Sequence, residues 1–106
     1  MENERELLSI CTERLAQELP ALRKICRLTQ KNIGDLVGVS RQTITNIESG
    51  KCKMQWTLFL ALILLFSLNR DCLNHIKKME IPYGQVKEVL ASKIKKGTQS
   101  GRGEKA

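Results

Sequence analysis

The chain has 106 residues, a formal net charge of +7, and 42% hydrophobic residues, which fits one domain with a modest core. It holds a single histidine, no acidic pair at fixed spacing and no glycine-rich phosphate loop, which argues against an enzyme. No apolar run opens the sequence, so we expect no secretory signal.

The four cysteines show no CxxC pair. Cys72 and His75 are three residues apart, but structural zinc needs two further ligands, and the other cysteines are scattered. We therefore expect no metal and no cofactor. No cysteine has neighbours that would activate it as a nucleophile. Cys11, Cys26, Cys52 and Cys72 are expected to be small buried or half-buried thiols in a reducing cytoplasm.

The chain begins with a helical pattern at residues 3–18, where leucines recur at helical spacing and acidic residues gather at the start. Pro20 suits the first turn of a helix, so we predict a separate second helix at about 20–27.

The next predicted helix covers residues 30–37, with Thr29 as its N-cap. Gly34 is small enough to let another helix approach closely, and Gly38 can adopt a positive φ in a tight turn. One buried stripe is predicted from the spacing of Ile33, Leu36 and Val37.

A further helix is predicted at residues 41–49, capped by Ser40 and ended by Gly50. Ile44 and Ile47 share one side, and packing on that side must hold so short a helix in place. An outward arc of about 140° remains for polar residues. It comprises Arg41, Gln42, Thr45, Asn46 and Ser49.

Two helices joined by a short turn, the second with a free polar face, are typical of a DNA-binding helix-turn-helix. Gln42 and Asn46 can each pair with adenine, Arg41 with guanine or a phosphate, and Thr45 with a thymine methyl group or a base edge. Contacts to the DNA backbone are assigned to Gln30, Lys31, Ser40, Thr43, Lys51 and Lys53. Lys24 and Arg27 are weaker candidates, which could only cover the helix surface.

Charge is distributed unevenly along the chain. Residues 21–53 carry seven basic and two acidic side chains, and residues 93–106 carry five and one. This pattern suits a polyanionic partner, although basic charge alone could simply keep the chain in solution. The basic residues of the tail could add phosphate contacts or only be solvated.

The segment 55–67 is predicted to be a helix that is apolar all round. It is too short to cross a bilayer, which takes about 20 residues. Such a helix must be covered on more than one side, by the terminal helices or by a second subunit.

The C-terminal part is expected to contain a helix at 71–79, with Leu73 and Ile76 inward, and a last helix at about 82–95. We predict one helical domain over residues 1–92, with a helix-turn-helix core at about 21–66 and its motif at 30–49. A basic, disordered tail should follow at 93–106.

Residues 21–66 resemble the helix-turn-helix domain of the lambda-repressor-like, or XRE, family of bacterial and phage regulators. The similar stretches are LRKICRLTQ, IGDLVGVSRQTITNIESGK and TLFLALILLF. The resemblance implies an all-α helix-turn-helix bundle, here with extra N- and C-terminal helices.

The resemblance also implies roles for single residues. Gln30 would open the second helix of the domain and touch the DNA backbone, and Lys51 would meet a phosphate. Arg23 and Glu48 would form a structural ion pair between the first helix and the recognition helix. Met54 stands where the family often has proline, which leaves the conformation of the loop at 52–56 open.

These observations favour a sequence-specific, double-stranded DNA-binding transcriptional regulator, a repressor acting by occlusion. One helix-turn-helix reads few base pairs, so we expect a homodimer. A cytoplasmic location at the nucleoid, away from membranes, follows. The alternative is a protein-interaction module, such as an antitoxin that binds a partner protein through its terminal helices.

Overall fold

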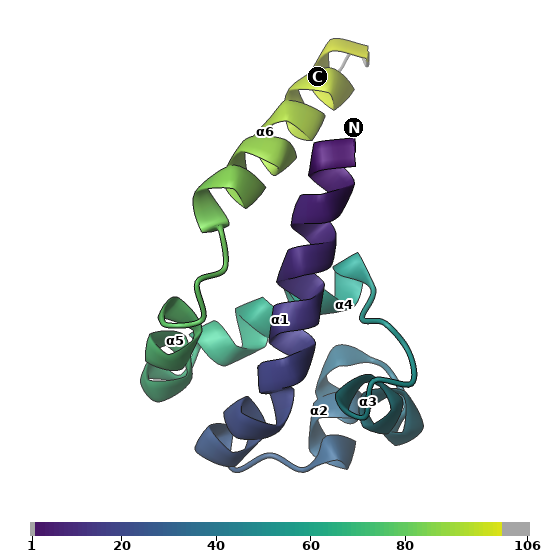
Figure 1. Cartoon of the computed structure of the whole chain (residues 1–106), viewed down its shortest axis with the longest axis vertical. Coiled ribbons are helices and arrows are strands. Elements are labelled where there is room, and N and C mark those ends of the chain that lie inside the picture. The colour runs from purple at the N-terminus through teal and green to yellow at the C-terminus, as the bar shows by residue number, and fades with distance from the viewer. Residues whose placement is uncertain (1, 101–106) are drawn as a thin grey trace.

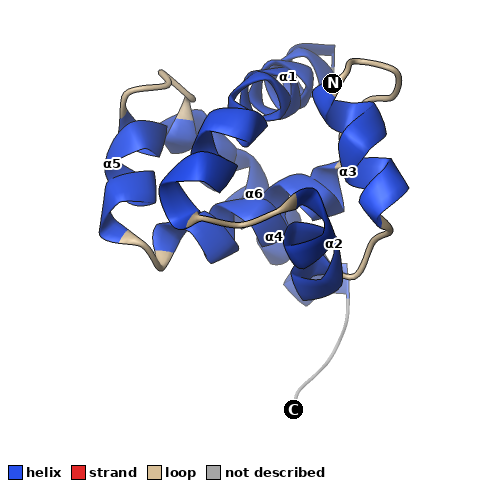
Figure 2. Ribbon diagram, turned by 90° about the horizontal axis from the view of Figure 1, so that it is seen from below, coloured by secondary structure: helices blue, strands red, loops and turns tan. Residues whose placement is uncertain are grey.

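The computed structural model describes residues 2–100, which form six helices and no strand (Figures 1 and 2). The all-α prediction is therefore confirmed. The helices are α1 (Glu2–Cys26), α2 (Gln30–Val37), α3 (Arg41–Glu48), α4 (Trp56–Ser67), α5 (Arg70–Lys77) and α6 (Tyr83–Ser100). Within this part of the chain, no helix is both long and apolar enough to cross a bilayer.

α1 runs through the middle of the fold, and the other elements gather round it (Figure 1). It packs against α3, α4, α5 and α6. Leu15, Leu19 and Leu22 of α1 are fully buried, as are Phe59 and Phe66 of α4. The core is thus built mainly between α1 and α4, and α2 and α3 are attached at one end of it.

The predicted break before Pro20 is wrong, because α1 continues through it. A proline inside a helix costs about 3 kcal/mol. Leu15, Leu19 and Leu22 lie on both sides of the proline and are fully buried. Burying a leucine side chain contributes about 1.5–3 kcal/mol. The continuous apolar stripe therefore outweighs the cost of the proline.

The turn between α2 and α3 closes on the carbonyl of Gly34, which accepts the N–H groups of Gly38 (2.8 Å) and Val39 (2.9 Å). Gly38 has a φ of 82°, the left-handed conformation predicted for it. A Cβ atom at Gly34 would lie 2.6 Å from the carbonyl oxygen of Val39. The backbone of the turn therefore occupies the space that a side chain would need.

Leu36 is 59% exposed, so its predicted place in the buried stripe of α2 is wrong. The buried residues of α2 are Ile33 and Gly34. The close approach at Gly34 turns the buried side of the helix toward α3. Going round the helix from Ile33, Gly34 lies on one side and Leu36 lies about 60° away on the other side. Leu36 therefore faces outward.

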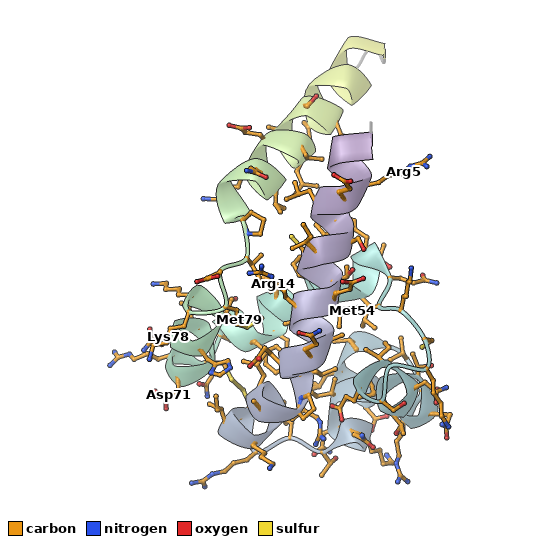
Figure 3. The ribbon with its side chains drawn as sticks, viewed as in Figure 1. Arg5, Arg14, Met54, Asp71, Lys78 and Met79 are labelled. Atoms are coloured by element: carbon orange, nitrogen blue, oxygen red, sulfur yellow. A yellow bond between two sulfur atoms is a disulfide. The ribbon has the colours of Figure 1, made fainter. Side chains whose placement is uncertain are left out.

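Polar contacts join α5 and the segment after it to α1. The His75 Nε2 atom lies 2.7 Å from Glu18 Oε1. Arg14 donates to the carbonyl oxygens of Met79 (3.1 Å) and Glu80 (2.8 Å), and Figure 3 shows its side chain pointing toward that segment. Cys72 and Ile76 are fully buried, and Leu73, predicted to point inward, is half-buried.

Cys26 at the end of α1 and Cys72 in α5 form a disulfide, whereas Cys11 and Cys52 are free. The expectation of four thiols is therefore wrong for this pair. The expected burial is also wrong for Cys52, which is exposed because it lies in the loop after α3. Cys26 and Cys72 are 46 positions apart in sequence, and only the packing of α5 against α1 brings them together.

α6 continues to Ser100, beyond its predicted end at about 95. The tail predicted at 93–106 overlaps the last residues of α6, and residues 101–106 lie outside the described part. Extending an existing helix adds a hydrogen bond for each residue fixed, which favours continuation. α6 packs beside the N-terminal half of α1, with Leu7 and Val86 buried and Lys93 3.5 Å from Glu4.

We expect Gly34→Ala to lower the free energy of unfolding by about 1–3 kcal/mol, because the new methyl group meets backbone atoms that cannot move away cheaply. Alanine is otherwise the better helix former by about 1 kcal/mol, so the sign of the change tests the close approach. Urea denaturation followed by circular dichroism measures it. Gly38→Asn is the control: nothing lies within 4 Å there, and asparagine tolerates a positive φ, so the change should be small.

Candidate nucleic-acid interface

α3 is fixed by caps at both ends and by two buried side chains. The Thr43 N–H donates to Ser40 Oγ (3.1 Å), which satisfies a free group of the first turn. Ile44 and Ile47 are 0% and 3% exposed. Since these two isoleucines face the core, the polar side of this eight-residue helix faces outward.

The end of α3 turns sharply at Gly50, whose φ is 83°. The N–H of Gly50 donates to the Ile47 carbonyl (3.2 Å), and the N–H of Lys51 donates to the Asn46 carbonyl (2.8 Å). These two bonds form a Schellman motif, which satisfies the last carbonyls of the helix. The motif also fixes where the backbone leaves α3, and thereby the position of Lys51.

Glu48 links α3 to both preceding helices. Arg23 of α1 donates to its carboxylate through Nε (2.6 Å) and Nη2 (3.0 Å), and Gln30 of α2 donates through Nε2 (2.9 Å). The side chains of Glu48 and Arg23 are 8% and 19% exposed. The carboxylate is thus largely removed from water and its charge is matched by a two-point ion pair.

The network continues from Glu48 to the outer side of α3. Thr45 Oγ1 donates to Gln30 Oε1 (2.8 Å), so the Gln30 amide joins Glu48 to Thr45. One turn away, Gln42 Nε2 donates to Asn46 Oδ1 (3.0 Å). Thr45, Gln42 and Asn46 therefore have hydrogen-bond partners within the chain, and the Gln42 carbonyl and the Asn46 amide hydrogens remain for another partner.

A basic hollow of about 690 Å³ lies between the end of α1 and the start of α2, beside the first residue of α3. Five cationic side chains contribute to its lining, namely Arg23, Lys24, Arg27, Lys31 and Arg41. Arg23 is committed to Glu48, and Lys31 forms an exposed pair with Asp35 (3.0 Å). The exposed Lys24, Arg27 and Arg41 leave the hollow strongly positive.

Arg27 has a φ of 60°, a left-handed conformation that costs a non-glycine residue about 1–2 kcal/mol. It ends α1, and the next N–H, that of Leu28, donates to the Arg23 carbonyl (2.9 Å). In the sequence, Lys24 and Arg27 were only weak candidates for DNA contacts. The feature that could have singled them out is their position, because both come shortly before Thr29, the N-cap of α2.

The loop between α3 and α4 is held by Met54, which is 5% exposed. Figure 3 shows this side chain beside α1. Burial of Met54 thus fixes a loop in which the lambda-repressor-like family often has proline. The feature of the sequence that could have indicated this burial is a single methionine between polar residues. Lys51 and Lys53, on the same loop, are both exposed.

The residues predicted to contact DNA lie on α3 and on the segments that flank it, together with the start of α2. Arg41, Gln42, Lys31, Ser40, Lys51 and Lys53 are exposed, and Gln30, Thr43, Thr45 and Asn46 are half-buried. Several of them already have partners within the chain. Ser40 caps α3, Gln30 links Glu48 to Thr45, Gln42 bonds to Asn46, and Lys31 pairs with Asp35.

Burial raises the pKa of the Cys11 thiol, an effect that nearby Arg14 partly opposes. A buried thiol with a raised pKa holds its proton at neutral pH and is a poor nucleophile.

Among the described residues, no three histidine, cysteine or acidic side chains come together as a metal site. The polar groups near α3 are hydrogen-bonding side chains and cations, which suit recognition.

The profile of the helix-turn-helix domain family matches residues 14–75, more than half of the chain, so this chain belongs to that family. No curated protein and no solved structure shows a significant match to it. Membership suggests DNA binding, because α2, the turn and α3 are the parts with which a helix-turn-helix engages a duplex.

We expect Glu48→Gln to lower the free energy of unfolding by about 3 kcal/mol, because it leaves the Arg23 charge largely buried without a counter-charge. Replacing both residues by leucine should cost less than the two single leucine substitutions together, since no charge is then left unpaired. Urea denaturation of the unaltered chain, the two single leucine variants and the double variant measures this coupling.

The exposed pair of Lys31 and Asp35 provides the control for that measurement. Lys31→Ala should change stability by less than about 0.5 kcal/mol, because water screens that pair. Strictly additive effects of the Arg23 and Glu48 substitutions would contradict the role assigned to the buried pair.

Proposed function

We propose that this chain is a sequence-specific regulator of transcription of the lambda-repressor-like (XRE) type, which binds double-stranded DNA with α3 in the major groove. The observation that carries the proposal is the contrast between the two sides of α3. One side is anchored by Ile44, Ile47 and the Glu48 network, and the other presents ordered hydrogen-bonding groups.

Base reading is assigned to Arg41, Gln42, Thr45 and Asn46. Gln42 and Asn46 hydrogen-bond to each other, which leaves the Gln42 carbonyl and the Asn46 amide hydrogens for a base edge. A carbonyl and an amide N–H match the hydrogen-bonding groups of adenine in the major groove. Because the two side chains are already ordered, little conformational entropy would be lost on binding.

Backbone contacts are assigned to Gln30, Lys31, Ser40, Thr43, Lys51 and Lys53, and the basic hollow supports adding Lys24 and Arg27. The hollow lies at the N-terminal end of α2, where the helix dipole also favours a phosphate. Lys51 and Lys53 lie beyond the opposite end of α3. Phosphates on both sides of the groove could therefore be held at once.

The proposed mode of action is repression by occlusion of the bound site. A single α3 reads few base pairs, so two copies would bind half-sites about 34–36 Å apart. A regulator of this kind acts at the nucleoid, in the cytoplasm.

We expect Gln42→Ala and Asn46→Ala each to weaken binding to a preferred site by about 10- to 100-fold, because each removes a group that pairs with a base and also the partner that orients the other side chain. Binding to unrelated duplexes should change little. Lys51→Ala should weaken all sequences alike and reduce the salt slope by about 1. Selection from random duplexes by the unaltered chain supplies the preferred site, and gel shifts at several salt concentrations give the affinities.

Lys87→Ala is the matched control for Lys51→Ala, since Lys87 is an exposed lysine on α6 and should leave affinity unchanged. If the Gln42 and Asn46 substitutions leave site preference unaltered, α3 is not the reading helix.

Arg27→Gly should have effects of opposite sign on stability and binding. Glycine adopts a left-handed conformation freely, so the free energy of unfolding should rise by about 1 kcal/mol. The loss of a cation from the basic hollow should weaken binding to every duplex. Thermal denaturation and gel shifts measure the two effects, and unchanged DNA affinity would remove the hollow from the interface.

A second candidate function is the binding of a partner protein, as by an antitoxin. It is supported by the pairing of α6 with the N-terminal half of α1, which leaves Ile10 43% exposed. Gel shifts at low salt separate the two functions, because non-specific DNA binding is strongest there. A chain that shifts no duplex under those conditions would favour the protein-binding function.

A further inference from the structure

α4 differs from the other five helices in that it carries no charged residue. α1, α2 and α5 pack against it and bury one side, which includes Phe59, Leu62 and Phe66. The opposite side keeps three exposed leucines, which we call the leucine face. They are Leu60 (37% exposed), Leu64 (67%) and Leu68 (79%).

The leucine face is a continuous apolar stripe. Residues four apart lie on the same side of a helix, with an offset of about 40° at each step. Leu60, Leu64 and Leu68 therefore follow one line along α4 and its C-cap. Chains in water rarely leave such a stripe open unless it takes part in an interaction.

The leucine face lies outside the base-reading side of α3. A hollow between α3 and α4 is lined by Leu58 and Ala61 of α4 and by Thr43 and Lys53, which are assigned to phosphate contacts. Gln42 and Asn46 do not line this hollow. Another molecule could thus cover the leucine face while the base-reading side of α3 stays open.

We propose that the leucine face binds the leucine face of a second copy of this chain, with the two α4 helices antiparallel across a two-fold axis. This inference rests on the proposed function in one respect, since reading two half-sites calls for two copies. When the axis passes Leu64, that residue meets the partner's Leu64. Leu60 then meets the partner's Leu68, so the pattern of the stripe is self-complementary.

Charge limits where two copies of this chain can meet. Each chain carries a formal charge of +7, so two copies repel each other through most of their surfaces. The absence of charge on α4 lets two copies meet there without placing like charges together or removing a charge from water. A strongly charged partner would find no complementary group on this face.

The first test is sedimentation of the full chain at tens of micromolar without DNA. The unaltered chain should sediment as a dimer. Leu64→Glu should raise the dissociation constant at least about 100-fold, because two carboxylates would be buried against each other. Leu64 is already exposed, so the fold should survive, and circular dichroism checks that it does.

Ile10→Glu is the matched control, because Ile10 is an exposed apolar residue of α1 outside the leucine face. It should leave the dimer intact. A chain that is monomeric throughout, or a dimer that survives Leu64→Glu, would overturn the proposal. A dimer lost only with Ile10→Glu would place the interface on α1 and α6 instead.

Cross-linking tests the antiparallel register. In a Cys52→Ser background, Leu64→Cys should cross-link to itself through a short bis-maleimide. Leu60→Cys should cross-link to Leu68→Cys in a mixture of the two variants, and far less to itself. Strong self-cross-linking by Leu60→Cys and Leu68→Cys would indicate parallel helices and refute this register.

These readouts contain no DNA, so they are independent of the proposed function. A chain that dimerises through Leu64 but binds no duplex would refute regulation of transcription and leave the interface standing. A monomer that binds DNA specifically would refute the leucine-face interface and leave the proposed function standing.

Discussion

The carboxylate of Glu48 is the interaction on which the candidate interface depends. It belongs to α3 but accepts hydrogen bonds from Arg23 of α1 and Gln30 of α2. Ile44 and Ile47 bury one side of α3 against the core and so set which side of the helix faces outward. The bonds to Glu48 are directional and come from two helices, so they tie α3 to α1 and α2 in a defined orientation.

Orientation passes outward from this point through hydrogen bonds. Gln30 connects Glu48 to Thr45, so an internal ion pair determines how a surface hydroxyl is presented. The same end of α1 that supplies Arg23 also supplies Lys24 and Arg27 to the basic hollow. Groups suited to bases and groups suited to phosphates are therefore positioned by the same junction of three helices.

Local signals in the sequence predicted the motif well. The caps at Thr29 and Ser40 and the positive φ at Gly38 depend only on neighbouring residues, and α2 to α4 begin and end within one residue of their predicted limits. The errors at Pro20 and Leu36 have another origin. Both were decided by packing against distant segments, which periodicity within one helix does not contain.

Contacts between distant positions explain the remaining differences. The disulfide joins residues 46 positions apart, and the link between Gln30 and Thr45 spans 15.

The unbroken course of α1 also bears on how the molecule unfolds. Because α3, α4, α5 and α6 all pack against α1, none of them can detach without exposing part of α1 to solvent. Loss of structure should therefore be concerted, with the amide hydrogens near Leu15 and Leu19 the last to exchange with solvent.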